Sequence, residues 1–179
     1  MTTFQTANVD YLAILPLLIV FGTALIGVLV EAFVGRERRH LIQTILAVAG
    51  LVAAFVAVIV ATGHMGLTLG HVDGATDRRL FALSIDGPAL FMQGALLLMS
   101  ILAVLTMAER LGGTGSDTFT PSGASTPGSQ IEAVSARAGL ITSEVFPLTM
   151  FAVGGMLLFP TVNDLIGMFV ALEILSLPL

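Results

Sequence analysis

Long, nearly uninterrupted apolar runs restrict what this chain can fold into more than any other feature. Four of them cover residues 11–30, 41–62, 88–108 and 145–162, and a fifth begins after Asn163 and Asp164 and continues to Leu179. A helix needs about 20 predominantly apolar residues to cross the hydrocarbon of a bilayer. Because the runs are continuous rather than alternating, they predict membrane-spanning helices.

The overall composition agrees with a membrane protein. Hydrophobic residues make up 56% of the chain and charged residues only 11%, whereas a soluble domain has about 25% charged residues. The absence of cysteine excludes disulfides and thiolate-bound metals or clusters. His40, His64 and His71 do not have the spacing of a metal site. We therefore expect an all-α, polytopic membrane protein of about five transmembrane helices, with no cofactor or metal of its own and no nucleic-acid partner.

The chain divides into three parts. Residues 1–110 hold the first three helices, residues 111–143 form a Gly/Ser/Pro-rich loop, and residues 144–179 hold the fourth helix and the start of a fifth. The loop has the composition of a flexible linker, so it is either a tolerated surface insertion or a regulatory or docking insertion. The fifth run offers about 24 Å of helix against about 30 Å of hydrocarbon. We expect the natural chain to continue beyond Leu179.

The arginines predict the orientation, because cytoplasmic loops carry an excess of basic residues. The chain has no lysine, and its seven basic residues are all arginines. The first and third loops hold five of them and the second loop holds two: Arg36, Arg38, Arg39, Arg110 and Arg137 against Arg78 and Arg79. This distribution predicts that the N-terminus lies outside and that the fifth helix enters from the outer face.

Glu173 is the main candidate for chemistry, because apolar residues precede and follow it in the fifth helix. It lies nine residues after Asp164, which is about 13.5 Å along a helix and close to mid-membrane. Charged side chains at this depth are costly, and they mark proton or ion paths or pair with a partner. A carboxyl group facing a movable cation could take up and release a proton. The alternative is a fixed structural salt bridge or hydrogen bond between helices.

Four other polar or helix-breaking residues are weaker candidates. Asn163 is a good N-cap for the fifth helix and Asp164 complements its positive end, with a role as outer proton acceptor as the alternative. Glu31 fits snorkelling to the membrane boundary or a pair with a nearby arginine, with an auxiliary place in a charge chain as the alternative. Gln93 can bridge helices by hydrogen bonds. Pro178 removes the usual helical donor of the Ile174 carbonyl, which predicts a kink with or without a bound water.

Two helix interiors also carry local signals. Gly154 and Gly155 in the fourth helix predict a close approach of neighbouring helices. Asp86 before Gly87 and Pro88 predicts a capped start of the third helix.

The stretches FPLTMFAVGGMLLF (146–159) and NDLIGMFVALEILSLPL (163–179) resemble the antiporter-like subunits of respiratory complex I, the bacterial NADH-quinone oxidoreductase. In the subunit N family, the counterpart of mitochondrial subunit 2, the fifth helix reads roughly ANDLLTLFLGLELLSLPLY. The sister families L and M tend to have an aromatic residue just before the glutamate, so Ala171 and Leu172 favour N. Weaker similarity comes from LSIDGPALFMQ (83–93) and LVEAF (29–33), and the latter and the long loop are similar to actinobacterial versions.

The resemblance implies a fold of about 14 helices with two inverted repeats and broken central helices, of which this chain would hold the N-terminal portion. It places the family's essential fifth-helix glutamate at Glu173, and its lysine partners beyond Leu179. It implies a proton-translocating subunit in a bacterial inner (plasma) membrane, coupled to quinone reduction elsewhere in the complex. FMN, iron–sulfur clusters and quinone would belong to other subunits.

The same resemblance implies the partners. They are neighbouring antiporter-like and small membrane-arm subunits, lipids and a respiratory supercomplex. One alternative is a subunit of a multi-subunit sodium/proton antiporter, which shares the same helices. Another is a scaffold that transports nothing and in which Glu173 is structural.

Overall fold

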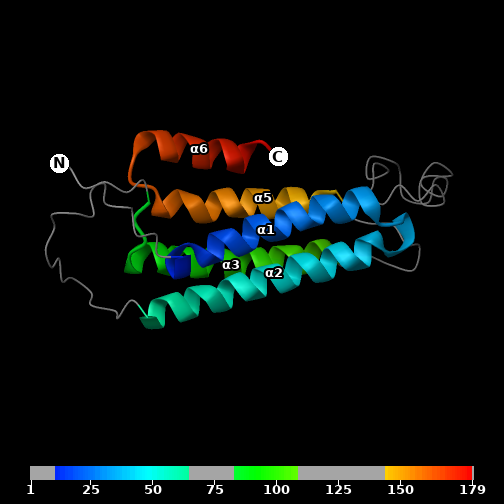
Figure 1. The fold of residues 1–179 in the computed structure, drawn as a ribbon, viewed down its shortest axis with the longest axis horizontal. Coiled ribbons are helices and arrows are strands. Elements are labelled where there is room, and N and C mark those ends of the chain that lie inside the picture. Colours follow the sequence, from blue (N-terminus) through cyan, green and yellow to red (C-terminus); the bar gives the residue numbers. More distant parts are fainter. Residues whose placement is uncertain (1–10, 65–82, 109–143, 179) are drawn as a thin grey trace, which may run out of the picture.

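The computed structural model describes residues 11–64, 83–108 and 144–178, and it shows a bundle of helices lying along one long axis (Figure 1). The described elements are α1 (Tyr11–Phe33), α2 (Arg36–His64), α3 (Gly87–Ala108), α5 (Val145–Leu158), the short 3-10 helix η3 (Phe159–Thr161) and α6 (Leu165–Ser176). The bridge between Leu83 and Val162 is the one β-type pairing among the described residues. The all-α prediction is confirmed. The loop predicted at 111–143 lies outside the described residues.

Three helices are long and apolar enough to cross a membrane. These segments are Tyr11–Phe33, Arg38–Gly63 and Gly87–Ala108, with 23, 26 and 22 residues. The fourth and fifth predicted spans appear as the shorter apolar segments Val145–Thr161 and Leu165–Ser176. The α-helical part of the fourth span ends at Leu158 and tightens into η3, because Pro160 supplies no N–H to continue the α-helical ladder.

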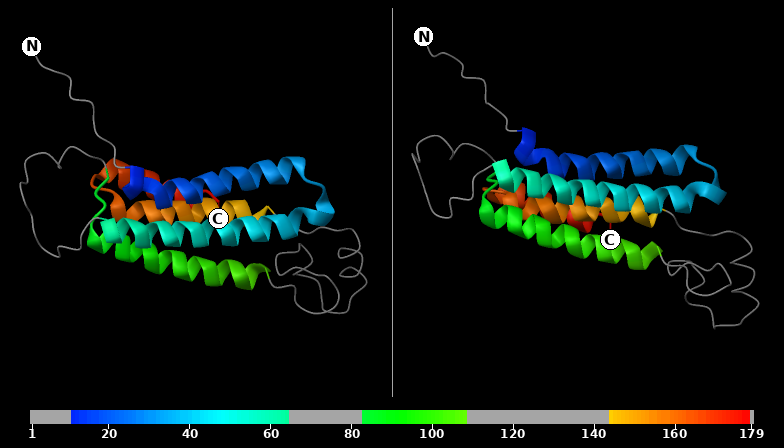
Figure 2. Two further views of the ribbon diagram at one scale, coloured as in Figure 1. Left: turned by 60° about the horizontal axis from the view of Figure 1, so that its bottom comes forward. Right: turned by 90° about the horizontal axis from the view of Figure 1, so that it is seen from below.

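The core of the bundle runs between α1, α2, α3 and α5, which lie side by side in each view (Figure 2). Its largest fully buried side chains include Val20, Leu51, Leu97, Met150 and Leu157. The outer surface carries many exposed large apolar side chains, among them Phe91 at 75% and Phe169 at 62% exposure. An apolar surface around a well-packed interior suits a bundle whose solvent is lipid.

The predicted close approach at Gly154 and Gly155 is confirmed. A Cβ atom on Gly155 would lie 2.6 Å from the backbone N of Leu175, and one on Gly154 would lie 2.6 Å from Cε1 of Phe21. Helix α5 therefore touches α1 on one side and α6 on the other. Among the described elements, α6 packs only against α5 and η3.

Helix α6 differs from its prediction at its start, whereas its other end leaves the predicted kink untested. It ends at Ser176, and Leu177 and Pro178 form a turn in which the Leu177 N–H donates to the Glu173 carbonyl at 2.9 Å. The predicted kink at Pro178 stays a prediction, because the structure describes only Leu177 and Pro178 after the helix. At the start, the N-cap is Asp164 rather than Asn163, and its Oδ1 accepts the Gly167 N–H at 2.6 Å.

Candidate functional site

Glu173 lies on the side of α6 that faces away from the rest of the described bundle. The side that touches α5 is marked by Ala171, which is 0% exposed, and by Leu175, whose backbone lies against Gly155. Glu173 is two residues from each of them, which turns its side chain about 200° around the helix at 3.6 residues per turn. The side chain is exposed. The fold of α6 onto α5 therefore presents this carboxylate outward.

No described residue forms a hydrogen bond or an ion pair with the Glu173 carboxylate. The interactions of this residue run through its backbone carbonyl, which accepts the N–H of Leu177 at 2.9 Å and the hydroxyl of Ser176 at 3.3 Å. Two neighbouring exposed side chains on α6 are apolar, with Phe169 at 62% and Leu172 at 44% exposure. A carboxylate on such a surface can be accommodated in a membrane only with a partner or water from elsewhere.

Asp164 acts as a helix cap in this structure. Its extended backbone and its hydrogen bond to Gly167 are the features of an N-cap residue. The bond also explains Gly167, because a Cβ there would lie 2.6 Å from Asp164 Oδ1. The structure does not bring Asp164 and Glu173 together, since they occupy different turns of one helix. The role of Asp164 as a proton acceptor stays a prediction.

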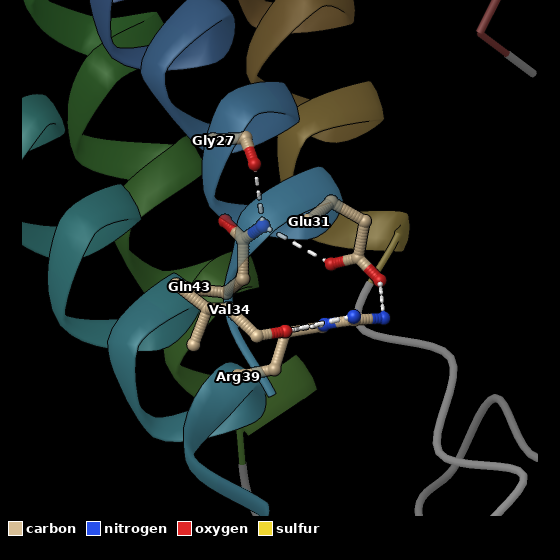
Figure 3. A network of polar contacts seen from close by, with 5 residues as sticks. All are labelled: Gly27, Glu31, Val34, Arg39 and Gln43. Atoms are coloured by element: carbon tan, nitrogen blue, oxygen red, sulfur yellow. Dashed lines mark hydrogen bonds and ion pairs between the residues drawn. The ribbon is translucent and has the colours of Figure 1, made fainter. Parts of the chain in front are cut away.

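Glu31 lies in a polar network where the chain turns from α1 into α2 (Figure 3). Its Oε1 is 2.8 Å from Nη1 of Arg39, and its Oε2 accepts a 3.2 Å hydrogen bond from Gln43. Arg39 also donates from Nε and Nη2 to the Val34 carbonyl at 3.1 and 2.8 Å. Gln43 donates further to the Gly27 carbonyl at 2.7 Å. The predicted pairing of Glu31 with an arginine is confirmed, and the arginine is Arg39.

Gln43 was not predicted to belong to this network, in which it is 1% exposed. Its spacing was an available signal, because Gln43 follows Arg39 by four residues and therefore shares its helix face. The network also lies close to α5, since a Cβ on Gly27 would lie 3.1 Å from Cβ of Pro147. It therefore satisfies a charge at the junction of three helices.

His40 strengthens the same end of the bundle. It is 6% exposed, and its ring packs edge-on against Phe146 at a centroid distance of 5.4 Å. Within the described ranges, no group of three or more His, Cys, Asp or Glu side chains is placed to hold a metal ion. This ring contact packs α2 against the start of α5.

At the opposite end of the bundle, hydrogen bonds connect α3 and the residues before it to α5 and η3. Gln93 is completely buried and donates from Nε2 to the Leu157 carbonyl at 3.2 Å, which confirms its predicted role as a bridge between helices. The Ser84 N–H donates to the Thr161 carbonyl at 2.7 Å, just before α3. The predicted cap is also confirmed, because Asp86 Oδ1 accepts the Ala89 N–H at 2.9 Å. These contacts fix the corner from which α6 begins.

The fold and the apolar surface define an all-helical, polytopic membrane protein. No family model matches the chain. The chain is 53% identical to NADH-quinone oxidoreductase subunit N of Acidothermus cellulolyticus, covering 96% of this chain and 31% of that protein. It is 44% identical to the subunit N of Rhodococcus opacus, with coverage of 99% and 34%, and 43% identical to that of Mycobacterium tuberculosis, with coverage of 96% and 34%.

The chain spans about a third of the length of the curated relatives it matches. It is a homologue of NADH-quinone oxidoreductase subunit N over that third, and the matched relatives are actinobacterial. The resemblance carried by the fourth and fifth helices, including its actinobacterial character, is therefore confirmed.

Proposed function

We propose that this chain is the N-terminal part of a proton-translocating membrane-arm subunit of NADH-quinone oxidoreductase, and that Glu173 is its proton-relay residue. The observation that supports this most directly is the position of Glu173. Its side chain is exposed on the side of α6 away from α5, and no described residue pairs with it. The names of the relatives support the assignment to the complex.

The packing of α6 suggests how the residue works. Gly155 lets the backbone of α6 approach α5 closely, and Ala171 fills the contact. This contact holds Glu173 on a fixed helix while a cationic partner in a later part of the protein approaches or withdraws. An unpaired carboxylate in hydrocarbon is costly, so withdrawal of the cation favours uptake of a proton. Return of the cation favours its release.

The driving reaction would occur in other subunits. We propose that FMN, iron–sulfur clusters and quinone bind there, and that quinone reduction changes the position of the cationic partner. The proposed partners of this chain are the neighbouring membrane-arm subunits and lipids. The arginine distribution favours an N-terminus on the outside. The bacterial relatives support a location in the plasma membrane.

The test is a Glu173→Gln substitution in the complete complex, with quinone-coupled proton pumping as the readout. We expect pumping to fall while the complex still assembles, because glutamine keeps the size of the side chain and cannot release a proton. The matched control is Glu144→Gln, which changes an exposed acid at the N-cap of α5 that makes no side-chain capping bond. Unchanged pumping and turnover in the Glu173→Gln complex would reject the role of Glu173.

A sodium/proton antiporter subunit is the rival function that the same helices would serve. Copurification of the full-length protein with flavin and iron–sulfur subunits supports the oxidoreductase. Sodium-dependent proton transport in vesicles that lack those subunits would support the antiporter instead.

A further inference from the structure

A groove between α2 and α3 opens on the apolar surface of the bundle. It encloses about 570 Å³ and is lined by side chains from residues 55–63 of α2 and 90–98 of α3. The buried side chains of Val58 and Leu90 lie at its bottom, and the exposed side chains of Ile59 and Phe91 lie at its edges. The groove is therefore open to whatever surrounds the bundle.

The lining of this groove offers no hydrogen bond to an occupant. Its one polar side chain is Thr62, whose hydroxyl donates to the Val58 carbonyl of its own helix at 2.8 Å. Gly94 helps to keep the groove open, because a Cβ atom there would already be in contact with α2, 3.8 Å from Cγ1 of Val58 and 4.0 Å from Cε2 of Phe55. The groove therefore suits an apolar occupant that fits beside Gly94.

The length of the groove indicates what this occupant is. On each helix its residues extend about 12 Å along the axis, which is close to half of a hydrocarbon core of about 30 Å. They lie at the end of the bundle where α2 ends and α3 begins (Figure 1). A transmembrane helix of another subunit would extend well past the groove, whereas an acyl chain from one leaflet ends near the middle of the membrane. A cavity of about 150 Å³ holds one benzene ring, so the groove has room for an acyl chain.

Asp86 lies beside the end of the groove at the membrane boundary, because the apolar span Gly87–Ala108 begins directly after it. Its carbonyl accepts the Leu90 N–H at 3.0 Å, so it continues the face of α3 that lines the groove. Its side chain is exposed, and Oδ1 accepts the Ala89 N–H at 2.9 Å. A carboxylate has about four acceptor positions, so this one can accept a hydrogen bond from a further donor.

We propose that the groove binds one phospholipid whose headgroup carries a primary ammonium group. One acyl chain lies in the groove beside Gly94, and the ammonium donates a charge-assisted hydrogen bond to the Asp86 carboxylate. A quaternary ammonium headgroup has no N–H to donate, and a headgroup with net negative charge is repelled by the acid. This site specifies the proposal that lipids are partners of the chain. It rests on the membrane class of the fold and not on the role of Glu173, so its test and the pumping test can fail independently.

The test is photo-crosslinking of the complete wild-type complex in bilayers of one composition. Two probes carry the same photoreactive group on one acyl chain, and they differ only in a phosphatidylethanolamine or a phosphatidylcholine headgroup. We expect peptides that contain residues 55–63 and 90–98 to be labelled about 5-fold more by the ethanolamine probe, the upper end for an exposed ion pair. Equal labelling of these peptides by the two probes would overturn the proposal, and so would a cryo-EM map with a helix of another subunit in the groove.

A variant in the groove tests the place of the acyl chain. We expect Gly94→Leu to reduce the labelling of both groove segments by both probes, because the new side chain occupies the space of the acyl chain. The matched control is Gly22→Leu in α1, where no atom lies within 4 Å of a new Cβ, and it should label the groove like wild type. Unchanged groove labelling in an assembled Gly94→Leu complex would contradict the proposed position. The wild-type comparison decides even if this variant fails to assemble.

A variant at the mouth tests the headgroup contact. Asp86→Asn removes the charge but keeps a side chain that caps a helix, so we expect the acyl chain to label the groove without a preference for the ethanolamine probe. The control is Glu144→Gln, which removes an exposed acid before α5 and should keep the preference. A preference that persists in Asp86→Asn would show that Asp86 does not bind the ammonium group.

Discussion

Glu31 and Glu173 are both glutamates in apolar helices, and the bundle treats them in opposite ways. Glu31 is bound by Arg39 and Gln43, both within twelve residues of it along the chain. Glu173 lies on a helix that packs only against α5 and η3 among the described elements, and it points away from that contact. Glu31 is paired within the hairpin of α1 and α2. The Glu173 carboxylate has no partner among the described residues and faces away from them.

The difference separates a structural acid from a candidate functional one. Removing one partner of a buried ion pair leaves an uncompensated charge, so a local network such as that of Glu31 tends to stay closed. An acid whose partner comes from another part of the assembly can be paired and unpaired as that part moves. The depth of a charged residue along its helix does not distinguish these two cases. The residues that pair with it do.

The largest expected effect is on Glu173. We expect Glu173→Gln to lower pumping by about 100-fold or more, the contribution typical of a group that transfers a proton, with assembly retained. Glu31→Gln in the same complex should leave pumping per assembled complex close to wild type. The comparison between the two acids breaks down if the two variants lose pumping to the same extent.

The network of Glu31 should instead affect stability. We expect Glu31→Ala to lower stability by about 1.5–3 kcal/mol, the value of hydrogen bonds to a charged group, measured as the thermal inactivation of the purified complex. A double-mutant cycle with Arg39→Ala should give a coupling of about 0.5–3 kcal/mol. Additive losses in that cycle would show that the pair is not coupled.

The contact that holds α6 can be tested at Gly155. We expect Gly155→Ala to lower stability by about 1–3 kcal/mol by overpacking, because the new Cβ would lie 2.6 Å from the Leu175 backbone. The control is Gly22→Ala in α1, where no atom lies within 4 Å of the new Cβ. That control should be neutral or slightly stabilising, so equal destabilisation by both would argue against a specific α5–α6 contact.

The smallest expected effect concerns Asp164. We expect Asp164→Ala to lower stability by about 0.5–2 kcal/mol through loss of the N-cap, and Asp164→Asn to restore most of it because asparagine also caps. If Asp164 is only a cap, the asparagine variant should pump like wild type. Reduced pumping in a stable Asp164→Asn complex would instead show that the acid itself takes part in proton transfer.

Much of the fold could be predicted from residues that are close together in the sequence. The apolar runs predicted the helices, and Asp86 and Asp164 lie at capped helix starts as local chemistry requires. The fourth span changes to a 3-10 helix near Pro160, a local adjustment that hydrophobic length does not specify.

The sequence by itself determined the membrane class, the helices and the small set of polar residues that matter, because these depend on hydrophobic length and on groups a few residues apart. Only the tertiary structure decided which polar residues meet. The turn after α1 brings Arg39 and Gln43 to Glu31, α3 brings Gln93 to Leu157, and Gly155 sets which side of α6 is covered. The physical reason is that the state of a charge in an apolar medium depends on which helix faces it, and that is a property of packing rather than of the local sequence.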